Sequence, residues 1–473
     1  MPKDLRYDAG SYRDRDGRIF YSDSGEVCRA LSAPGLAAFQ AVQSTRFFQK
    51  GMTEGMIVRT EQLESAPSVL GLHESAWAGT LRHDTIPFLS YPYEWTFGML
   101  QDAALLHLEL LQAALDENTI IKDGTAYNVQ FVGARPTFID VLSFTRLEPG
   151  QPWAGYRQFC QTFLNPLFIQ SYKNISFHPM LRGRLAGISP GECSSLMSFR
   201  DLFRPGVLAH VSLHSRLDSD QHVRQSNPQP ALSRAGFDKS LIKNNVANLA
   251  RIIRRLKWNP PDSTWSAYAE CNTYSDADRR RKAEFVREAV ASQPLGLVWD
   301  LGCNTGVYAR IAAEHARCVV AMDGDHLAVE RLYQSLKAQP SATGHGTILP
   351  LVSNVADPSP SMGWQGAERK SLVERGQPEL TMCLALIHHL VIDAGIPLRD
   401  LLAWLAGLGS SLIIEFVDRN DPMVQLLLRN RRDTCADYEL ENFERRLGEF
   451  FDISRSVALE SGTRRLYFAW SRS

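Results

Sequence analysis

The residues best suited to chemistry lie in the second half of the chain, where short apolar runs end. In the loop D-L-G-C-N-T-G, Asp300 closes an apolar run, and Gly302 and Gly306 flank Asn304. Glycines let the backbone approach a ligand closely, and the helix expected to follow offers free N–H groups and a positive dipole end. The pattern therefore predicts a strand, a tight turn and a helix that together bind a nucleotide-type ligand.

The residues around this loop narrow the kind of ligand. Lys-Ser or Lys-Thr does not follow Gly306, which argues against a Walker phosphate loop, and Asn304 replaces a glycine of the dinucleotide fingerprint. The next apolar run, C-V-V-A-M, ends in Asp323, about twenty residues past the loop. A carboxylate at that position can accept hydrogen bonds from both hydroxyls of a ribose, so we expect a nucleoside-containing ligand.

A histidine pair, His388 and His389, follows the apolar run L-T-M-C-L-A-L-I. The carboxyl end of a parallel strand is where ligands bind in such sheets, and neutral imidazole has a pKa suited to removing a proton from an acceptor. One of the two histidines is therefore a candidate general base. The alternative is that the pair caps the next helix.

Three carboxylates near the next apolar run, S-L-I-I-E-F-V, are further candidates for contacting an acceptor. They are Glu415, Asp418 and Asp421. Asp421 is followed by Pro422, which is typical of a helix N-cap with proline at the first helical position. We therefore expect Asp421 to cap a helix.

The order of these motifs resembles that of class I S-adenosylmethionine-dependent methyltransferases. D-L-G-C-N-T-G and A-M-D-G-D match the first two motifs, S-N-V-A-D (353–357) matches the motif that reaches the adenine, and the two later apolar runs match the fourth and fifth strands. The resemblance covers about residues 265–473. It implies a Rossmann-like α/β domain with a mostly parallel seven-stranded sheet, a closing antiparallel hairpin and S-adenosyl-L-methionine as cofactor.

The resemblance also implies a set of cofactor-binding residues. They are Asp300, Gly302, Asn304, Gly306, Asp323, Asp357 and Tyr274. The glycines would admit the methionyl part, Asp323 would hold the ribose and Asp357 the adenine amino group. Methyl transfer from a sulfonium is an in-line displacement that releases a neutral group, so the protein mainly has to align donor and acceptor. No metal is expected in this domain.

A second set of candidates lies in the first half of the chain. The stretch K-D-G-T-A-Y-N contains Asp123 and Asn128, and Asp140 ends the hairpin expected to follow. After a long amphipathic helix, this arrangement resembles the catalytic and metal-binding segment of protein kinases and aminoglycoside-type phosphotransferases. The resemblance implies that Asp123 accepts a hydroxyl proton and that Asn128 and Asp140 bind magnesium–ATP.

The first half departs from the kinase pattern in several places. No His or Arg precedes Asp123, Phe-Gly does not follow Asp140, and neither a glycine-rich loop nor a V-A-I-K strand occurs upstream. Lys50 and Arg59 are the only nearby cations considered, and neither is well placed. The alternative is a structural hairpin whose Asp and Asn side chains cap turns.

At 473 residues the chain is longer than one hydrophobic core usually serves. We expect an α+β domain at 1–213, kinase-like or of another α+β fold. A polar linker with a basic helix follows at 214–264, and the methyltransferase domain occupies 265–473. The basic helix ends in R-I-I-R-R-L-K-W, whose apolar residues interleave with cations. That spacing favours a packed helix with a solvated cationic face over a nucleic-acid-binding segment.

Composition limits the partners. The formal net charge of −1 gives no long-range field toward nucleic acid or an anionic membrane, so binding to either would need a local patch.

The 8 cysteines show no C-x-x-C spacing, which favours reduced thiols in a cytoplasmic protein. The longest apolar stretch, 401–417, is interrupted and carries a glutamate, and the N-terminus lacks a signal-like run, so no membrane span is expected.

The whole chain resembles bacterial two-domain methyltransferases related to a rhizobial host-specific nodulation protein, through Y-P-Y-E-W, K-D-G-T-A-Y-N-V-Q-F and P-W-A-G-Y-R-Q-F-C. We therefore expect a methyltransferase that acts on an O or N atom of a small molecule or glycan. Two alternatives stay open: a bifunctional kinase-methyltransferase acting on a glycan end, and a non-catalytic scaffold that only binds nucleotides. The oligomeric state is not predicted.

Overall fold

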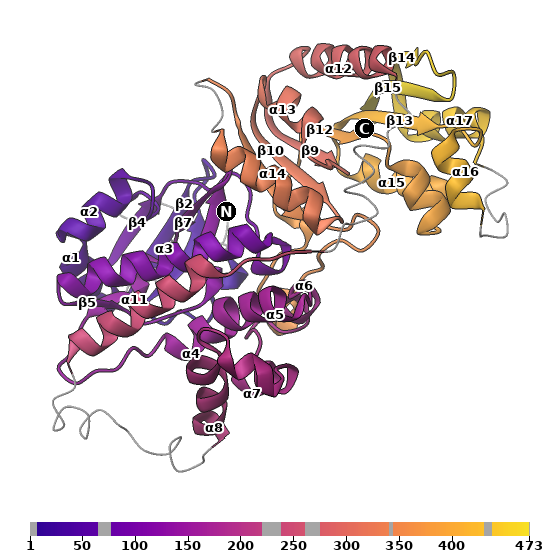
Figure 1. The fold of residues 1–473 in the computed structure, drawn as a ribbon. Helices are drawn as coiled ribbons and strands as arrows, with labels where there is room; N and C mark the ends of the chain where they lie inside the picture. Colours follow the sequence, from indigo (N-terminus) through magenta and orange to yellow (C-terminus); the bar gives the residue numbers. More distant parts are fainter. Residues whose placement is uncertain are drawn as a thin grey trace. The chain divides into compact units, whose positions relative to one another are not determined.

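The computed structural model describes residues 7–64, 77–219, 238–260, 275–339, 344–429 and 438–472. The chain forms two compact units, shown in Figure 1. The first comprises Met1–Phe131, Pro136–Asn259 and Met362–Arg369, and the second comprises Val132–Arg135, Pro260–Ser361 and Lys370–Ser473. Among the described residues, no helix has both the length and the hydropathy to cross a bilayer.

The first unit begins with a four-stranded antiparallel sheet in the order β1-β2-β4-β3. Its strands are β1 Gly17–Tyr21, β2 Val27–Leu31, β3 Thr60–Leu63 and β4 Gly79–His83. The hairpin of β1 and β2 turns at Gly25, which has a φ of 81° and donates its N–H to the Ser22 carbonyl at 2.9 Å. Helices α1 (Ala33–Gln43) and α2 (Arg46–Thr53) follow β2.

A long buried helix, α3 (Phe97–Asp116), supports the rest of the first unit. It begins at Thr96, whose hydroxyl accepts the N–H of Met99 at 3.2 Å. Four short strands follow it as two antiparallel pairs, in which β5 pairs with β8 and β6 with β7. Their bounds are β5 Thr119–Ile121, β6 Val129–Val132, β7 Arg135–Phe138 and β8 Phe144–Arg146.

The remaining helices of the first unit are mostly short. They are α4 Tyr156–Phe159, α5 Asn165–Lys173, α6 His178–Gly183, α7 Pro190–Leu196, α8 His214–Ser219 and α11 Lys239–Arg255, with π-helical turns at Cys160–Leu164 and Leu208–Leu213. The basic helix predicted from the sequence is α11, and it packs against α3 (Figure 1). Gln101 on α3 donates its amide to the carbonyls of Ile253 and Leu256, at 2.6 and 3.1 Å.

The second unit is built on a seven-stranded sheet in the order β11-β10-β9-β12-β13-β15-β14. Its strands are β9 Leu295–Leu301, β10 Ala316–Asp323, β11 Thr347–Val352, β12 Leu380–Cys383, β13 Ser411–Val417, β14 Phe451–Ala458 and β15 Arg464–Ser471. The first five are parallel to one another, and β15 lies antiparallel between β13 and β14. The mostly parallel sheet with a closing antiparallel hairpin is confirmed.

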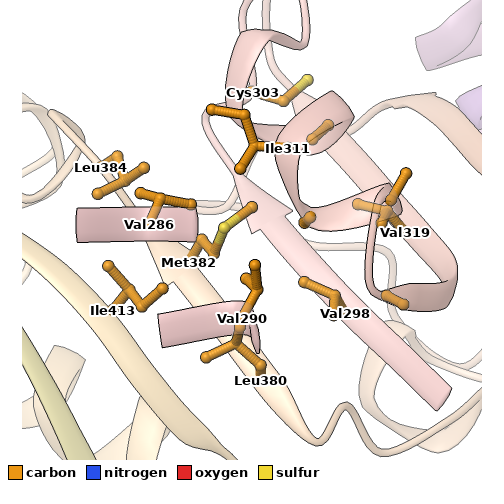
Figure 2. Close-up of a cluster of buried hydrophobic side chains, with 14 of the residues drawn as sticks. Val286, Val290, Val298, Cys303, Ile311, Val319, Leu380, Met382, Leu384 and Ile413 are labelled. Carbon is orange, nitrogen blue, oxygen red and sulfur yellow. The ribbon is translucent and has the colours of Figure 1, made fainter. Parts of the chain in front are cut away.

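Helices link the strands of the second unit. They are α12 Asp276–Ala291, α13 Val307–Ala313, α14 His326–Ala338, α15 Leu398–Gly407, α16 Pro422–Leu428 and α17 Leu440–Phe450. Figure 2 shows Val286 and Val290 of α12 lying against Leu380, Met382 and Ile413 of the sheet. Parallel strands covered in this way are apolar along their whole length, and each such buried side chain contributes roughly 1.5–3 kcal/mol. This core fixes the strand ends that carry the candidate site.

Candidate active site

The loop after β9 adopts a conformation that suits small residues. Gly302, Asn304 and Gly306 have φ values of 75°, 49° and 79°, in the left-handed region that favours glycine. The N–H groups of Gly302 and Cys303 both donate to the Met322 carbonyl, at 2.8 and 3.0 Å. These bonds hold the loop against the end of β10.

Packing supplies a second reason for the two glycines. A Cβ on Gly302 would lie 3.2 Å from Cδ1 of Leu386, and one on Gly306 would lie 2.6 Å from Cδ1 of Leu332. The sequence predicted that these glycines leave room for a ligand. In the structure they also leave room for two leucines of the protein itself.

Asp323 lies at the end of β10, beside this loop. Its Oδ2 accepts the N–H of Asn304 and its Oδ1 accepts the N–H of Asp325, each at 2.8 Å. Burial raises the pKa of this carboxyl, and the two backbone N–H groups oppose the rise. Each carboxylate oxygen can accept a further hydrogen bond, so the side chain is oriented and still able to bind two hydroxyls.

Three polar atoms near the loop have no hydrogen-bond partner among the described residues: Asp300 Oδ2, Asn304 Oδ1 and Ser353 Oγ. Asp300 is 2% exposed, and burial raises its pKa to about 7, although Lys282 acts in the opposite direction. Buried polar groups normally have a partner. These three atoms therefore indicate a polar site that a ligand or water completes.

The predicted adenine residue, Asp357, is exposed and lies in a turn in which its N–H donates to the Asn354 carbonyl at 2.9 Å. Ser353, by contrast, is buried, and its N–H donates to the carbonyl of Asp323 at 2.8 Å. Ser353 was missed as a site residue, although it begins the matching motif. The predicted site residue Tyr274 lies outside the described residues.

The two histidines occupy different environments. His388 is fully buried, and neither ring nitrogen has a hydrogen-bond partner among the described residues, whereas His389 is half-buried. Their ring centroids are 4.1 Å apart. Burial lowers the pKa of both imidazoles, that of His389 to about 4. Both rings are therefore neutral at physiological pH.

A buried ionic network crosses the second unit and was not predicted. Lys282 Nζ lies 2.6 Å from Glu415 Oε2, and Arg464 lies 3.4 Å from Glu415 Oε1 and 2.8 Å from Asp421 Oδ2. Asp421 also accepts the Met423 N–H at 3.0 Å, which confirms the predicted N-cap. Both acceptor-site candidates in this network are buried and paired, so they present no surface to an acceptor.

The kinase-like candidates of the first unit converge on one hydroxyl. Ser143 Oγ lies 3.2 Å from Asp123 Oδ2, 2.9 Å from Asp140 Oδ2 and 3.2 Å from Asn128 Nδ2. Burial raises the pKa of Asp123, and the nearby Asp140 carboxylate adds to this effect. The three predicted residues thus form one polar cluster, which the hydroxyl of Ser143 bridges.

Arg29 of β2 contributes a cation to this cluster, and no sequence motif indicated it. Its Nη1 lies 2.9 Å from Asp140 Oδ1 and 3.9 Å from Asp14 Oδ2. The Arg29 guanidinium keeps the pKa of Asp140 low despite burial, which acts to raise it. Of the two cations named from the sequence, Lys50 lies 3.8 Å from Glu54, and Arg59 lines a charged pocket together with Glu61, Arg82 and Asp84.

A kinase-like site implies a magnesium ion beside this cluster. Carboxylate and amide oxygens are the ligands that magnesium prefers. Both oxygens of Asp140 are already bonded, however, one of them to the Arg29 cation. Among the described residues, no group of three or more His, Cys, Asp or Glu is placed to hold a metal ion. As arranged, the residues do not fit a metal.

Comparisons with known proteins give one extensive relative. No protein-family model matches the chain. Solved structures that resemble it include N-methyltransferase NodS from Bradyrhizobium japonicum WM9, with 12% identity, a TM-score of 0.30 and coverage of 42% of this chain and 99% of that one. The bifunctional kinase-methyltransferase WbdD has 18% identity, a TM-score of 0.29 and coverage of 43% of this chain and 42% of that one.

The extensive relative is nodulation protein NoeA of Rhizobium meliloti (strain 1021). It is 34% identical over 462 residues, which cover 97% of this chain and 95% of the relative. The whole-chain resemblance predicted from the sequence is thereby confirmed. Because the match spans both structural units, the chain belongs to the family of nodulation protein NoeA.

Proposed function

We propose that the second unit is an S-adenosylmethionine-dependent methyltransferase. The observation that carries the proposal is the hydrogen bond of 2.8 Å between the Asn304 N–H and Asp323, which joins the glycine loop of β9 to a carboxylate at the end of β10. Both lie beside the point where the strand order reverses, between β9 and β12. Open parallel sheets bind nucleotide ligands at such switch points.

The residues present fit the cofactor. Asp323 has free lone pairs for the two ribose hydroxyls, and the orphaned oxygens of Asp300, Asn304 and Ser353 offer further acceptors or donors around the loop. Asp357 remains the sequence-based candidate for the adenine. When bound, S-adenosylmethionine supplies an electrophilic methyl group whose departure leaves a neutral thioether. The protein's task is then to align the acceptor and, where needed, to remove its proton.

The acceptor in this proposal is an O or N atom of a small molecule or glycan. His389 is the better candidate for the base, because it is half-buried and neutral whereas His388 is wholly enclosed. Neutral imidazole can take a proton from a hydroxyl group as the methyl group transfers, or from an ammonium group beforehand, so that the nitrogen has a lone pair to attack the methyl group. His388 would then serve as packing behind it.

The cofactor assignment is tested by replacing Asp323 with Ala in the full-length protein. Loss of the ribose acceptor is expected to weaken S-adenosylmethionine binding by on the order of 1.5–3 kcal/mol, roughly ten- to a hundredfold. Isothermal titration calorimetry measures this change directly. The control is Asp400→Ala, which removes an exposed carboxylate in the first turn of α15. This variant should bind S-adenosylmethionine like wild type. Absence of binding by the wild type, or equal affinity in both variants, would reject the assignment.

A second candidate function is phosphotransfer by the first unit, which would make the protein a bifunctional kinase-methyltransferase. The convergence of Asp123, Asn128 and Asp140 on Ser143 favours it. The ion pair between Arg29 and Asp140 opposes it, because a guanidinium beside Asp140 competes with a divalent cation. The remaining alternative is a unit that binds a ligand without catalysis.

Phosphotransfer predicts that millimolar magnesium–ATP raises the melting temperature of the full-length protein and that Asp140→Asn abolishes the rise. Binding at a hundred times Kd stabilises a protein by about 2.7 kcal/mol, which a thermal shift readily detects. Asp116→Asn, on the exposed end of α3, is the matched control. A melting temperature that responds to S-adenosylmethionine but not to magnesium–ATP would leave methyl transfer as the single activity.

A further inference from the structure

A groove in the first unit lies outside both candidate sites. It runs between the π-helical turn Leu208–Leu213 and α11 and has a volume of about 390 Å³. Leu208 and Leu213 line one side of it, and Arg251 and Arg255 line the other. Both leucines are exposed, although large apolar side chains usually pack inward. We call this the basic groove.

The basic groove carries two arginines that no described carboxylate neutralises. Arg251 and Arg255 are exposed and have no carboxylate partner among the described residues. Arg204, at the end of the groove, bonds to Asp201 at 3.0 Å and lies 4.9 Å from the centre of the Tyr172 ring. The described residues that line the groove include no Asp or Glu. The chain, with a net charge of −1, therefore has the local cationic patch that binding to an anionic surface requires.

Two aromatic side chains extend this patch. Phe199 is 76% exposed and Phe203 80%, and their ring centroids are 5.8 Å apart in an edge-to-face arrangement. They belong to the 3-10 turn that directly precedes Arg204. Asp201 fixes this turn, because its carboxylate accepts the Ser198 N–H at 2.7 Å and pairs with Lys173 at 2.9 Å. The exposure of the rings is therefore a property of an ordered turn.

We propose that the basic groove and the Phe199–Phe203 turn bind the surface of an anionic phospholipid membrane. Arginine guanidinium groups form bidentate hydrogen bonds with phosphate. Aromatic and leucine side chains next to cations insert at the boundary between the lipid head groups and the acyl chains. The two phenylalanines project from a short turn and do not line a long slot. Two exposed rings on a short turn are better suited to inserting into the interfacial region of a lipid bilayer than to packing against a folded protein.

The test is co-sedimentation of the full-length protein with lipid vesicles at low ionic strength. The protein should bind vesicles that contain phosphatidylglycerol and not vesicles of pure phosphatidylcholine, and added salt should release it. Arg251→Glu with Arg255→Glu should weaken binding by roughly 100- to 1,000-fold, since two cations near an anionic surface are lost and two anions replace them. Phe199→Ser with Phe203→Ser should weaken binding without removing its salt dependence.

The control is Arg146→Glu with Arg280→Glu, which makes the same change of net charge at exposed positions of β8 and α12. This control should bind vesicles within a few-fold of wild type, and all variants should keep wild-type affinity for S-adenosylmethionine, which separates this proposal from the methyltransferase assignment. Failure of the wild type to sediment with phosphatidylglycerol vesicles would overturn the proposal. So would equal losses in the control and groove variants, or binding of polyglutamate but not vesicles, which would identify the surface as a site for an acidic protein.

Discussion

Replacement of Glu415 by Leu is expected to lower the free energy of unfolding by about 3–5 kcal/mol, because it removes the carboxylate that pairs with two buried cations. Glu415 is fully buried and pairs with both Lys282 and Arg464. Burial lowers the pKa of the Lys282 ammonium, while Glu415 opposes that fall. Removal of the carboxylate takes away the strongest attraction that offsets the burial of Lys282 and leaves the weaker attraction of Asp300, so the folded chain is destabilised.

Urea denaturation followed by circular dichroism measures this loss. Glu314→Leu is the matched control, because Glu314 forms an exposed pair with Arg287 at 3.4 Å and such pairs contribute at most about 1 kcal/mol. The double variant Lys282→Met with Glu415→Leu should recover much of the lost stability, because both members of the closest pair then disappear together. A loss below 1 kcal/mol in the single variant would show that the network is dispensable for folding.

The network shows what sequence patterns could and could not predict. Lys282 ends the run R-R-R-K, which invites interpretation as a solvated face, and the three arginines are indeed exposed. Lys282, however, lies three and four residues before Phe285 and Val286, so helical periodicity could have placed it on the buried face. Its partner Glu415 is 133 residues away, and no local pattern joins the two. Only the tertiary structure could reveal the pair.

The seven-stranded sheet was predictable for a different reason. The apolar runs that end in polar motifs indicated buried parallel strands, and the resemblance of the ordered motifs to class I methyltransferases implied the seven-stranded sheet that the structure contains. The same logic correctly placed Asp323 beside the β9 loop. It could not separate Ser353 from Asp357, because both belong to one motif and only their burial differs.

Arg29 was not predicted as a site residue because the sequence of its strand contains no motif typical of binding or catalysis. It stands between Cys28 and Ala30 in an otherwise apolar segment and is itself buried. A cation on a buried strand requires an anion, which could have prompted a search for a partner. That partner, Asp140, is 111 residues away and was already a candidate on other grounds. The two observations together would have linked β2 to the kinase-like cluster.

Replacement of His389 by Ala is expected to lower the turnover of methyl transfer by roughly 10²–10⁴ while the affinity for S-adenosylmethionine stays unchanged, because general-base assistance acts on the transition state. His388→Ala is the matched control. Its ring is fully buried and has no hydrogen-bond partner among the described residues, so its loss should affect stability more than turnover. The acceptor is first identified by incubating cell extract with radiolabelled cofactor, since the labelled product names it.

The pH dependence of the rate gives an independent test of His389 as the base. An ordinary imidazole base would make the rate fall as the pH drops through about 6.5. Burial lowers the pKa of His389 to about 4, so its neutral, proton-accepting form predominates at every pH above about 5. The rate should therefore be flat from about pH 5 to 8 and fall only as the pH drops toward 4. A rate that is constant between about pH 5 and 8 is therefore compatible with His389 as the general base. The role is rejected if His389→Ala keeps near-wild-type turnover, and the mechanism then reduces to alignment of donor and acceptor.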